Sequence, residues 1–394
     1  VCLVPTGLLT FDGKLLPNAH AFADLNGDND TELIVGSMAG KIAGLSSSES
    51  AYEHSIDGCI TTIVPHVMEG GAYSVLFVTT EEGLCFVLRK HPKEDRFLTL
   101  TQFEIPLNVS AAAIISTNLT LGTRDATIHM FDISNVENAQ EIKKLRLHSE
   151  VESIMRQDTL LIICLNNGDV LKLANLNTKA WLQKGWQNSG RSFALSEIKS
   201  EGKKSFDALG CLDGFVQLKD MHTNDALWEI QLPDALLGMA TISLFQDGDE
   251  EIALCCWNGD IYIVSKFGSQ LRFTIPFSIT AFFSGEFGDC AEDTLFCATT
   301  SGGILYYSGI GKFIRRIRHQ SVLQAINTSD LMETLNSTEK RSMLLNALKD
   351  YLPSNTQSSE PSMTDCIRAC VYAPNTIVEP KPIENPQLEP VANP

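Results

Sequence analysis

The stretch "EIALCCWNGDIYIV", residues 251–264, decides the fold class of this chain. An apolar run of strand length comes first, the pair Asn258-Gly259 follows, and a second alternating run completes the unit. An Asn-Gly pair supplies the positive φ angles that a tight β-hairpin needs. The stretch therefore predicts two antiparallel strands joined by a tight turn.

The same unit returns at a regular spacing, with neighbouring turns 42 to 46 residues apart. The turn residues are Gly40, Gly83, Ala126, Gly168, Gly214, Gly259 and Gly302. A spacing of roughly 40 to 50 residues is typical of β-propellers, whereas a tandem of sandwiches needs about 100 residues per domain. We predict an all-β fold, a seven-bladed β-propeller over residues 1–320.

Two segments are expected to complete the last blade. The strand-like "TGLLTF" (6–11) precedes the first full unit, and its pairing with the last blade would close the ring and remove a free sheet edge. The basic stretch "KFIRRIRH" (312–319) is predicted as the outer strand of blade seven. This strand would expose Arg315, Arg316 and Arg318 to a partner protein.

The chain beyond the propeller is predicted to be helical over residues 321–352 and mostly flexible over the Pro-rich residues 353–394. Two helices start on Ser caps, at 329–335 and 337–352, and Pro353 ends the second. One face of the second helix carries Leu344, Leu345, Leu348 and Leu352. These leucines cover either the protein's own propeller or a partner.

Composition limits the classes of function. The 394 residues carry a formal net charge of −18, which argues against broad nucleic-acid binding because that needs a positive face. No apolar run approaches the roughly 18 residues of a transmembrane helix. Eleven cysteines without regular spacing, several of them inside apolar strands, favour free thiols in a reducing compartment over a disulfide-stapled secreted protein.

The loop "ADLNGDNDTELIVG" (23–36) resembles the calcium loop of FG-GAP repeats. Asparagine at 29 and glutamate at 32 depart from the usual Gly and Asp, and the equivalent loops at 243–251 and 285–293 have lost ligand positions. Two interpretations stay open: a calcium site, or a metal-free Asx-type turn. The candidate ligands are Asp24, Asn26, Asp28, Asp30 (through its carbonyl) and Glu32.

Catalytic motifs are missing from the sequence. The eight histidines form no H-x-x-x-H pair, and neither C-x-x-C nor G-x-S-x-G occurs. The Gly-Lys pair within 36–41 lacks the spacing and the Ser or Thr of a phosphate-binding loop. We expect no enzymatic activity and no required cofactor, with calcium as the one candidate ion. The basic stretches 143–148 and 312–319 form either solvated strand faces or a patch for phosphoinositides or an acidic partner.

Four stretches resemble the integrin-alpha FG-GAP repeat-containing protein two family. They are residues 13–42, 225–264, 271–285 and the ending "ACVYAPN" (369–375). The resemblance implies an intracellular, non-enzymatic propeller scaffold of the KICSTOR complex. That complex tethers the GATOR complex, a Rag-directed GTPase-activating complex, to the lysosome and restrains target-of-rapamycin signalling during nutrient starvation.

The resemblance also implies partners and a location. The partners are a kaptin-like propeller subunit and a very large seizure-threshold scaffold subunit, with the GATOR complex reached indirectly. The location is cytoplasmic, with peripheral association with the lysosomal membrane. The alternatives are an extracellular integrin-like propeller for calcium-dependent adhesion or carbohydrate binding, and a propeller of the ciliary cargo-coat type. Several intact calcium loops and paired cysteines would favour the extracellular class, and the sequence has neither.

Overall fold

The structure is a computed structural model, in which contacts divide the chain into two compact units, Val1–Ile310 and Gly311–Pro394. The described residues are 5–25, 27–28, 30–46, 51–67, 74–91, 94–157, 160–174, 181–183, 192–200, 204–220, 223, 225–244, 248–288 and 292–315.

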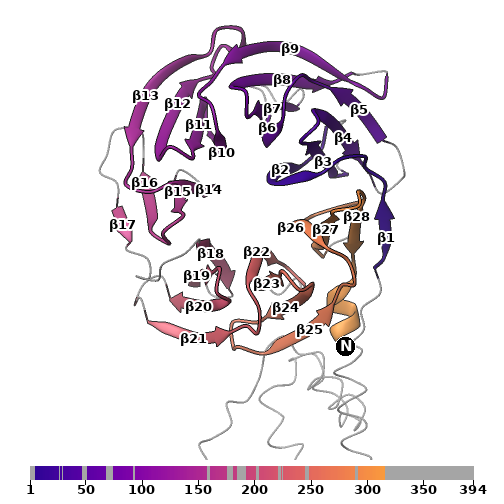
Figure 1. Cartoon of the computed structure of the whole chain (residues 1–394), viewed down its shortest axis with the longest axis vertical. Coiled ribbons are helices and arrows are strands. Elements are labelled where there is room, and N and C mark those ends of the chain that lie inside the picture. Colours follow the sequence, from indigo (N-terminus) through magenta and orange to yellow (C-terminus); the bar gives the residue numbers. More distant parts are fainter. Residues whose placement is uncertain are drawn as a thin grey trace, which may run out of the picture. The chain divides into compact units, whose positions relative to one another are not determined.

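Within the described residues, the strands form seven antiparallel sheets of four strands each, arranged as blades around a centre (Figure 1). Blades 1 to 3 consist of β2 Leu15–Ala23, β3 Glu32–Ser37, β4 Lys41–Leu45, β5 Ala51–Ser55; β6 Ile60–Val67, β7 Ser74–Thr80, β8 Leu84–Lys90, β9 Phe97–Glu104; and β10 Val109–Ile115, β11 Asn118–Thr123, β12 Thr127–Asp132, β13 Gln140–Arg146, with the 3-10 turn η1 Val136–Asn138 before β13.

Blades 4 to 7 follow the same order, with the first strand innermost. They consist of β14 Val151–Gln157, β15 Leu160–Leu165, β16 Val170–Ala174, β17 Trp181–Gln183; β18 Ser192–Ser200, β19 Lys204–Cys211, β20 Phe215–Asp220, β21 Ala226–Gln231; β22 Leu236–Ile242, β23 Glu251–Cys256, β24 Asp260–Val264, β25 Gln270–Thr274; and β26 Ile279–Gly285, β27 Thr294–Thr299, β28 Ile304–Tyr307 and β1 Gly7–Leu9.

The ring closes through the N-terminal strand, as the sequence predicted. Strand β1 pairs antiparallel with β28, so that Gly7 lies opposite Tyr306. The innermost strands contact one another from blade to blade, and β26 contacts β2. The predicted seven-bladed β-propeller is therefore confirmed.

The apolar core lies between neighbouring blades. In β3, Leu33 and Val35 pack in a cluster with residues of blade 7, whereas Ile34 packs in a cluster with residues of blade 2. Second and third strands are covered on both faces, which is why they read as continuous apolar runs. The outermost strand β13 is exposed along most of its length.

A small residue stands in the second strand of every blade, four positions before the turn. At Gly122 a Cβ atom would lie 2.8 Å from Cβ of Val151, the first residue of blade 4, and at Gly36 it would lie 2.6 Å from Cγ2 of Ile60 in blade 2. Neighbouring blades therefore approach too closely there for a large side chain. The residues at this place are Gly36, Thr79, Gly122, Cys164, Gly210, Cys255 and Ala298.

All seven predicted turn residues adopt a left-handed backbone, with φ between 63° at Ala126 and 88° at Gly302. In each turn this residue donates its N–H to the carbonyl three positions earlier, as Gly259 does to Cys256 at 3.1 Å. The hairpin prediction is thus confirmed in every blade, and Ala126 carries the strain of a non-Gly residue in this conformation.

The prediction of an outer strand at 312–319 is wrong for the described part of that segment. Residues 310–315 form a short helix, and residues 316–319 lie outside the described part of the chain. The outer position of blade 7 is already filled by β1, so β28 has no free edge on that side. The predicted helices at 329–335 and 337–352 and the tail at 353–394 also lie outside the described residues.

The turn geometry predicts opposite effects for two matched substitutions. Ala126→Gly should raise the free energy of unfolding by up to about 1 kcal/mol, because relief of left-handed strain exceeds the added chain entropy. Gly259→Ala should lower it by about 1 kcal/mol or more, because the new Cβ would also press on the Ile275 carbonyl. Urea unfolding of both variants measures the difference. Equal shifts in the same direction would contradict this account of the turns.

Candidate functional site

The oxygen-rich loop between β2 and β3 uses its carboxylates to hold its own backbone. Asp24 Oδ1 accepts a hydrogen bond from the Gly27 N–H at 2.6 Å, and Asp28 Oδ1 accepts one from the Asp30 N–H at 2.8 Å. Gly27 is left-handed, with φ of 81°. These are the bonds of Asx-type turns, in which a short acidic side chain caps the amide two or three residues later.

Glu32 points inward at the first position of β3. Only 1% of the residue is exposed. Its Oε2 accepts the Leu25 N–H at 2.9 Å, and its Oε1 accepts the Tyr52 hydroxyl at 3.3 Å. Burial raises the pKa of the Glu32 carboxyl, and the nearby negative charges of Asp28 and Asp24 add to this effect. Glu32 thus fastens both ends of the loop to the blade.

Calcium binding by this loop stays a prediction. Within the described ranges, no group of three or more His, Cys, Asp or Glu side chains is placed to hold a metal ion. Asn26 lies outside the described residues, and Asp30 was expected to contribute its backbone carbonyl. The carboxylates of Asp24 and Asp28 already accept amide hydrogen bonds, which is the arrangement of the metal-free turn.

The equivalent loop of blade 6 shows a different solution. Asp249 precedes Glu251, the first residue of β23, by two positions, as Asp30 precedes Glu32 in blade 1. Asp249 is buried, and its carboxylate contacts the Lys266 ammonium at 2.6 Å and the Ser200 hydroxyl at 2.7 Å. A lysine therefore supplies the positive charge that a cation would bring, and it ties blade 6 to blade 5.

The residues predicted to bind proteins lie mostly beyond the described part of the chain. Arg315 is helical and is the last residue of the chain that the structure describes. The remaining members of the set are Arg316, Arg318, Leu344, Leu345, Leu348 and Leu352, and the structure does not describe them. The other basic stretch, 143–148, begins in the exposed outer strand β13, in agreement with a solvated strand face.

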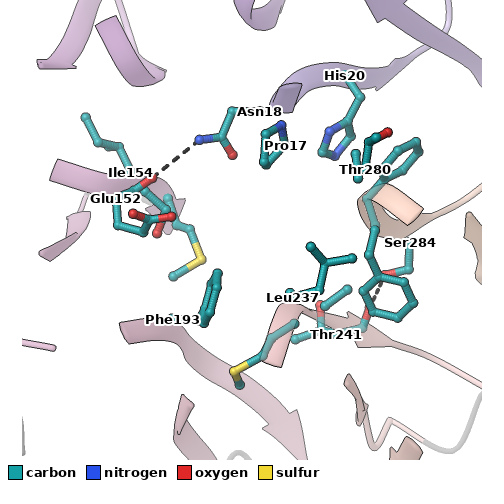
Figure 2. Close-up of a pocket in the computed structure, with 18 residues that line it drawn as sticks. Pro17, Asn18, His20, Glu152, Ile154, Phe193, Leu237, Thr241, Thr280 and Ser284 are labelled. Carbon is teal, nitrogen blue, oxygen red and sulfur yellow. Dashed lines mark hydrogen bonds between the residues drawn. The ribbon is translucent and has the colours of Figure 1, made fainter. Parts of the chain in front are cut away.

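A central cavity of about 380 Å³ lies among the described residues (Figure 2). Its walls come from the inner strands β2, β14, β18, β22 and β26. The 18 lining residues include apolar side chains such as Phe193 and Leu237 and several hydroxyls, but no Lys or Arg. The size and mixed lining are those of a small-molecule pocket, although sequence reasoning gave no signal for it.

A bulge in β2 narrows this cavity. The pairing of β2 with β3 breaks between Leu15 and His20, so the intervening residues leave the sheet. From this bulge, Asn18 Nδ2 donates to the Ser110 carbonyl at 2.8 Å. It also donates to the Glu152 carbonyl at 3.4 Å (Figure 2). Blade 1 is thereby linked to blades 3 and 4 across the middle of the ring.

The titratable groups of the cavity do not form a catalytic pair. Burial lowers the pKa of His20 to about 4, so the imidazole is neutral at physiological pH. Its ring stacks on Phe283 with centroids 4.0 Å apart, and its buried Nδ1 has no hydrogen-bond partner. The only carboxylate among the lining residues, Glu152, lies on the opposite side of the view from His20 (Figure 2).

The described cysteines are free, as the sequence predicted. They are Cys59, Cys85, Cys164, Cys211, Cys255, Cys256 and Cys297. Burial raises the pKa of Cys164 to about 12 and that of Cys256 to about 11, so these thiols are protonated and poorly nucleophilic.

The buried carboxyl of Glu32 predicts a pH-dependent difference between the wild type and Glu32→Gln. Because folding raises its pKa, the stability that Glu32 contributes is complete below its ordinary pKa of about 4.3 and is lost as the pH rises through the raised value. Gln is neutral throughout. Denaturant unfolding at several pH values should therefore show that the free energy of unfolding of the wild type falls relative to that of Glu32→Gln as the pH rises.

Tyr52→Phe provides a second readout of the same carboxyl. The hydrogen bond from the Tyr52 hydroxyl lowers the pKa of Glu32, so its removal should raise that pKa further. The pH range over which stability is lost should then extend to higher pH. A stability difference between the wild type and Glu32→Gln that is the same at every pH would contradict the raised pKa.

A calorimetric titration tests the calcium proposal. Any calcium held by the loop should depend on Asp24 and Asp28, so Asp24→Ala and Asp28→Ala should abolish the heat of binding. Asp12→Ala is the control, because this exposed carboxylate pairs with Lys41 outside the loop. Absence of heat from the wild type at millimolar calcium would assign the loop to a metal-free turn.

Solved structures with the same fold agree with the propeller. The match to the BBS1 N-terminal domain, solved in complex with ARL6, covers 78% of this chain and 98% of the BBS1 chain, with a TM-score of 0.60 and 16% identity. The match to Raptor from Chaetomium thermophilum covers 77% of this chain and 28% of the Raptor chain, with a TM-score of 0.59 and 12% identity. At these identities the similarity shows the fold alone.

Sequence comparison points to one family over the second half of the propeller. Residues 190–301, from β18 to β27, match the sequence model of integrin-alpha FG-GAP repeat-containing protein 2. The KICSTOR complex protein ITFG2 of Mus musculus is 30% identical over 91 residues, which is 23% of this chain and 20% of that protein. Its Bos taurus counterpart is 27% identical over 95 residues, 24% and 18% of the two chains.

The matched segments span about a fifth of each relative's length. Residues 190–301 include two of the stretches that carry the resemblance, 225–264 and 271–285, but neither 13–42 nor 369–375. The predicted resemblance to the integrin-alpha FG-GAP repeat-containing protein 2 family is thus confirmed, and it lies in blades 5 to 7.

Proposed function

We propose that this chain is a non-enzymatic propeller scaffold subunit of a KICSTOR-like complex. The match of residues 190–301 to the family model carries the proposal, together with relatives that are named as proteins of that complex. Blades 5 to 7, which carry the match, are an integral part of the closed ring.

The described geometry supports a binding role. The cavity lacks a paired acid and base, and the buried thiols with raised pKa are poorly nucleophilic. A propeller with two faces and seven outer edges offers more surface than one partner needs, which suits a subunit of a larger assembly. Among the described residues, no helix is long and apolar enough to cross a membrane.

The finer proposal concerns partners and place. The complex would contain a kaptin-like propeller subunit and a large seizure-threshold scaffold subunit, and it would reach the GATOR complex indirectly. It would sit in the cytoplasm and associate peripherally with the lysosomal membrane, where it would tether that Rag-directed GTPase-activating complex. Loss of the chain should then leave target-of-rapamycin signalling active during nutrient starvation.

The leucine face of residues 344–352 is the proposed contact for the kaptin-like subunit. Replacing Leu345 and Leu348 by Asp should weaken capture of that subunit at least tenfold, because two buried apolar contacts would become charged. The measurement is co-purification of the two full-length chains. Asn346→Asp serves as the matched control, since it adds one charge at a polar position of the same predicted helix.

Three results would count against parts of this proposal. Undiminished capture by the leucine variant, with cooperative melting retained, would move the contact to the propeller. Failure of the wild-type chain to join either proposed subunit would overturn the scaffold function. Turnover of a substrate by the purified chain would overturn its non-enzymatic character.

A further inference from the structure

Three large apolar side chains are exposed on one face of blades 5 to 7. In each four-stranded blade, the turn between the second and third strands lies at the same end as the loop that enters the next blade. This end carries Leu212 in the turn of blade 5, Trp257 in the turn of blade 6 and Phe277 in the loop entering blade 7. Their exposed fractions are 38%, 58% and 49%. We call these three residues the apolar turn patch.

Backbone contacts connect the three positions. The Leu212 carbonyl accepts the Leu236 N–H at 3.1 Å, and the adjacent Ala235 carbonyl accepts the Trp257 N–H at 2.9 Å. Two residues after Trp257, a Cβ at Gly259 would lie 3.8 Å from the Phe277 carbonyl. The patch therefore rests on turns and loops that are locked to one another, and its side chains are carried by a fixed backbone.

Folding of the hairpins does not require apolar side chains at these places. The position of Trp257 in its turn is held by polar residues in blades 2, 3, 4 and 7, namely Glu81, Arg124, Asn166 and Thr300. In all these blades the turn is closed by the same hydrogen bond from the left-handed residue. A Trp that is more than half exposed at a turn tip costs solubility and adds no core contact, so a binding role explains it better.

The surroundings of the patch are acidic. On this face, the described turns and loops between residues 147 and 303 contain the carboxylates of Glu150, Asp169, Asp213 and Asp234, but neither Lys nor Arg. The neighbouring guanidinium of Arg272, in β25, bonds Asp260 Oδ2 at 2.7 Å. Asp169 bonds His148 at 2.7 Å, and the carboxylates still outnumber the cations of these described turns and loops. An apolar centre beside such a net negative charge is complementary to a positively charged partner with apolar anchors.

We infer that the apolar turn patch binds a basic segment of a partner protein, which places an aliphatic or aromatic side chain against Trp257 and Phe277. This inference rests on the proposed scaffold function and specifies the surface and the chemistry of one partner. The patch lies within residues 190–301, the segment shared with the family. Trp is the residue type most enriched among energetic anchors of interfaces, and Asp213 and Asp234 would speed the encounter.

A membrane is the less favoured occupant. Cytoplasmic leaflets are negatively charged, and the acidic rim together with the net charge of −18 would oppose approach to them. Exposed Trp and Phe alone could still enter a neutral bilayer. The test therefore includes vesicles of neutral phosphatidylcholine and of phosphatidylserine.

The first probe is an 18-residue amphipathic peptide of Leu and Lys, compared with a Leu and Glu peptide of the same pattern. Fluorescence anisotropy of the labelled Lys peptide with the full chain should show saturable binding that weakens with salt. The Glu peptide should not bind. Trp257→Ser and Phe277→Ser should each weaken binding about tenfold or more.

Charge variants and matched controls separate the patch from general acidity. Asp213→Asn and Asp234→Asn keep the side-chain oxygen that bonds a backbone N–H in each case, and together they should flatten the salt dependence. Met38→Ser and Leu107→Ser remove exposed apolar side chains from the same face at blades 1 and 3, and they should leave binding unchanged. Thermal unfolding of each variant confirms that the ring is intact.

Several results would overturn the inference: equal binding of the Glu peptide, equal losses in the Met38 and Leu107 controls, or no loss in Trp257→Ser. Capture by vesicles that depends on Trp257, without peptide binding, would assign the patch to lipid and overturn it as well. Its failure is distinguishable from failure of the scaffold proposal. A wild-type chain that joins the proposed subunits but does not bind the peptide refutes only the patch.

Discussion

Close approach between neighbouring blades is the constraint on which the rest of the structure depends. No single blade can cover its own apolar faces, so each must lie against the next around the whole ring. The second strand meets the first strand of the following blade at a place with no room for a large side chain, as Gly122 and Val151 show. Gly, Ala, Cys and Thr alone occupy that place in the seven blades. The buried Cys164 and Cys255 therefore serve as small apolar residues at this place.

The hairpin turns made most of this fold predictable from the sequence. A left-handed residue recurs every 42 to 46 positions, and this single backbone requirement located all seven blades, including blade 3, where Ala126 replaces Gly. A separate argument, that an unpaired sheet edge is unfavourable, correctly placed residues 6–11 in the last blade. The prediction of an outer strand at 312–319 was wrong for its described part. It rested on alternating cations and apolar residues, a pattern that suits an edge strand. With β1 on that edge the last blade already has its four strands, so the predictions for residues 6–11 and 312–319 could not both hold.

The candidate sites were predictable only in part, for physical reasons. The pattern of oxygens around Asp24 identified the loop, but it could not show that Glu32 turns inward, because this depends on Tyr52 in another strand. The central cavity is lined by five inner strands that are far apart in sequence, one of which is the bulged strand β2. Of the apolar turn patch, the sequence shows only Trp257, an aromatic residue at a turn tip in "CCWNGD". Its meaning required the exposure and the acidic surroundings that only the assembled face provides.

The pairing of Gly7 with Tyr306 has a consequence for biosynthesis. Strand β1 leaves the ribosome before every other described strand, yet its partner β28 is made only after six blades have been translated. At about 5 to 20 residues per second, the first strand must wait on the order of tens of seconds. During this time the nascent chain exposes the unpaired strand β1 and the uncovered face of its latest blade. Chaperone binding during synthesis should therefore matter more for this protein than its short connections suggest, and a chain stalled before Tyr307 would remain an open, aggregation-prone arc.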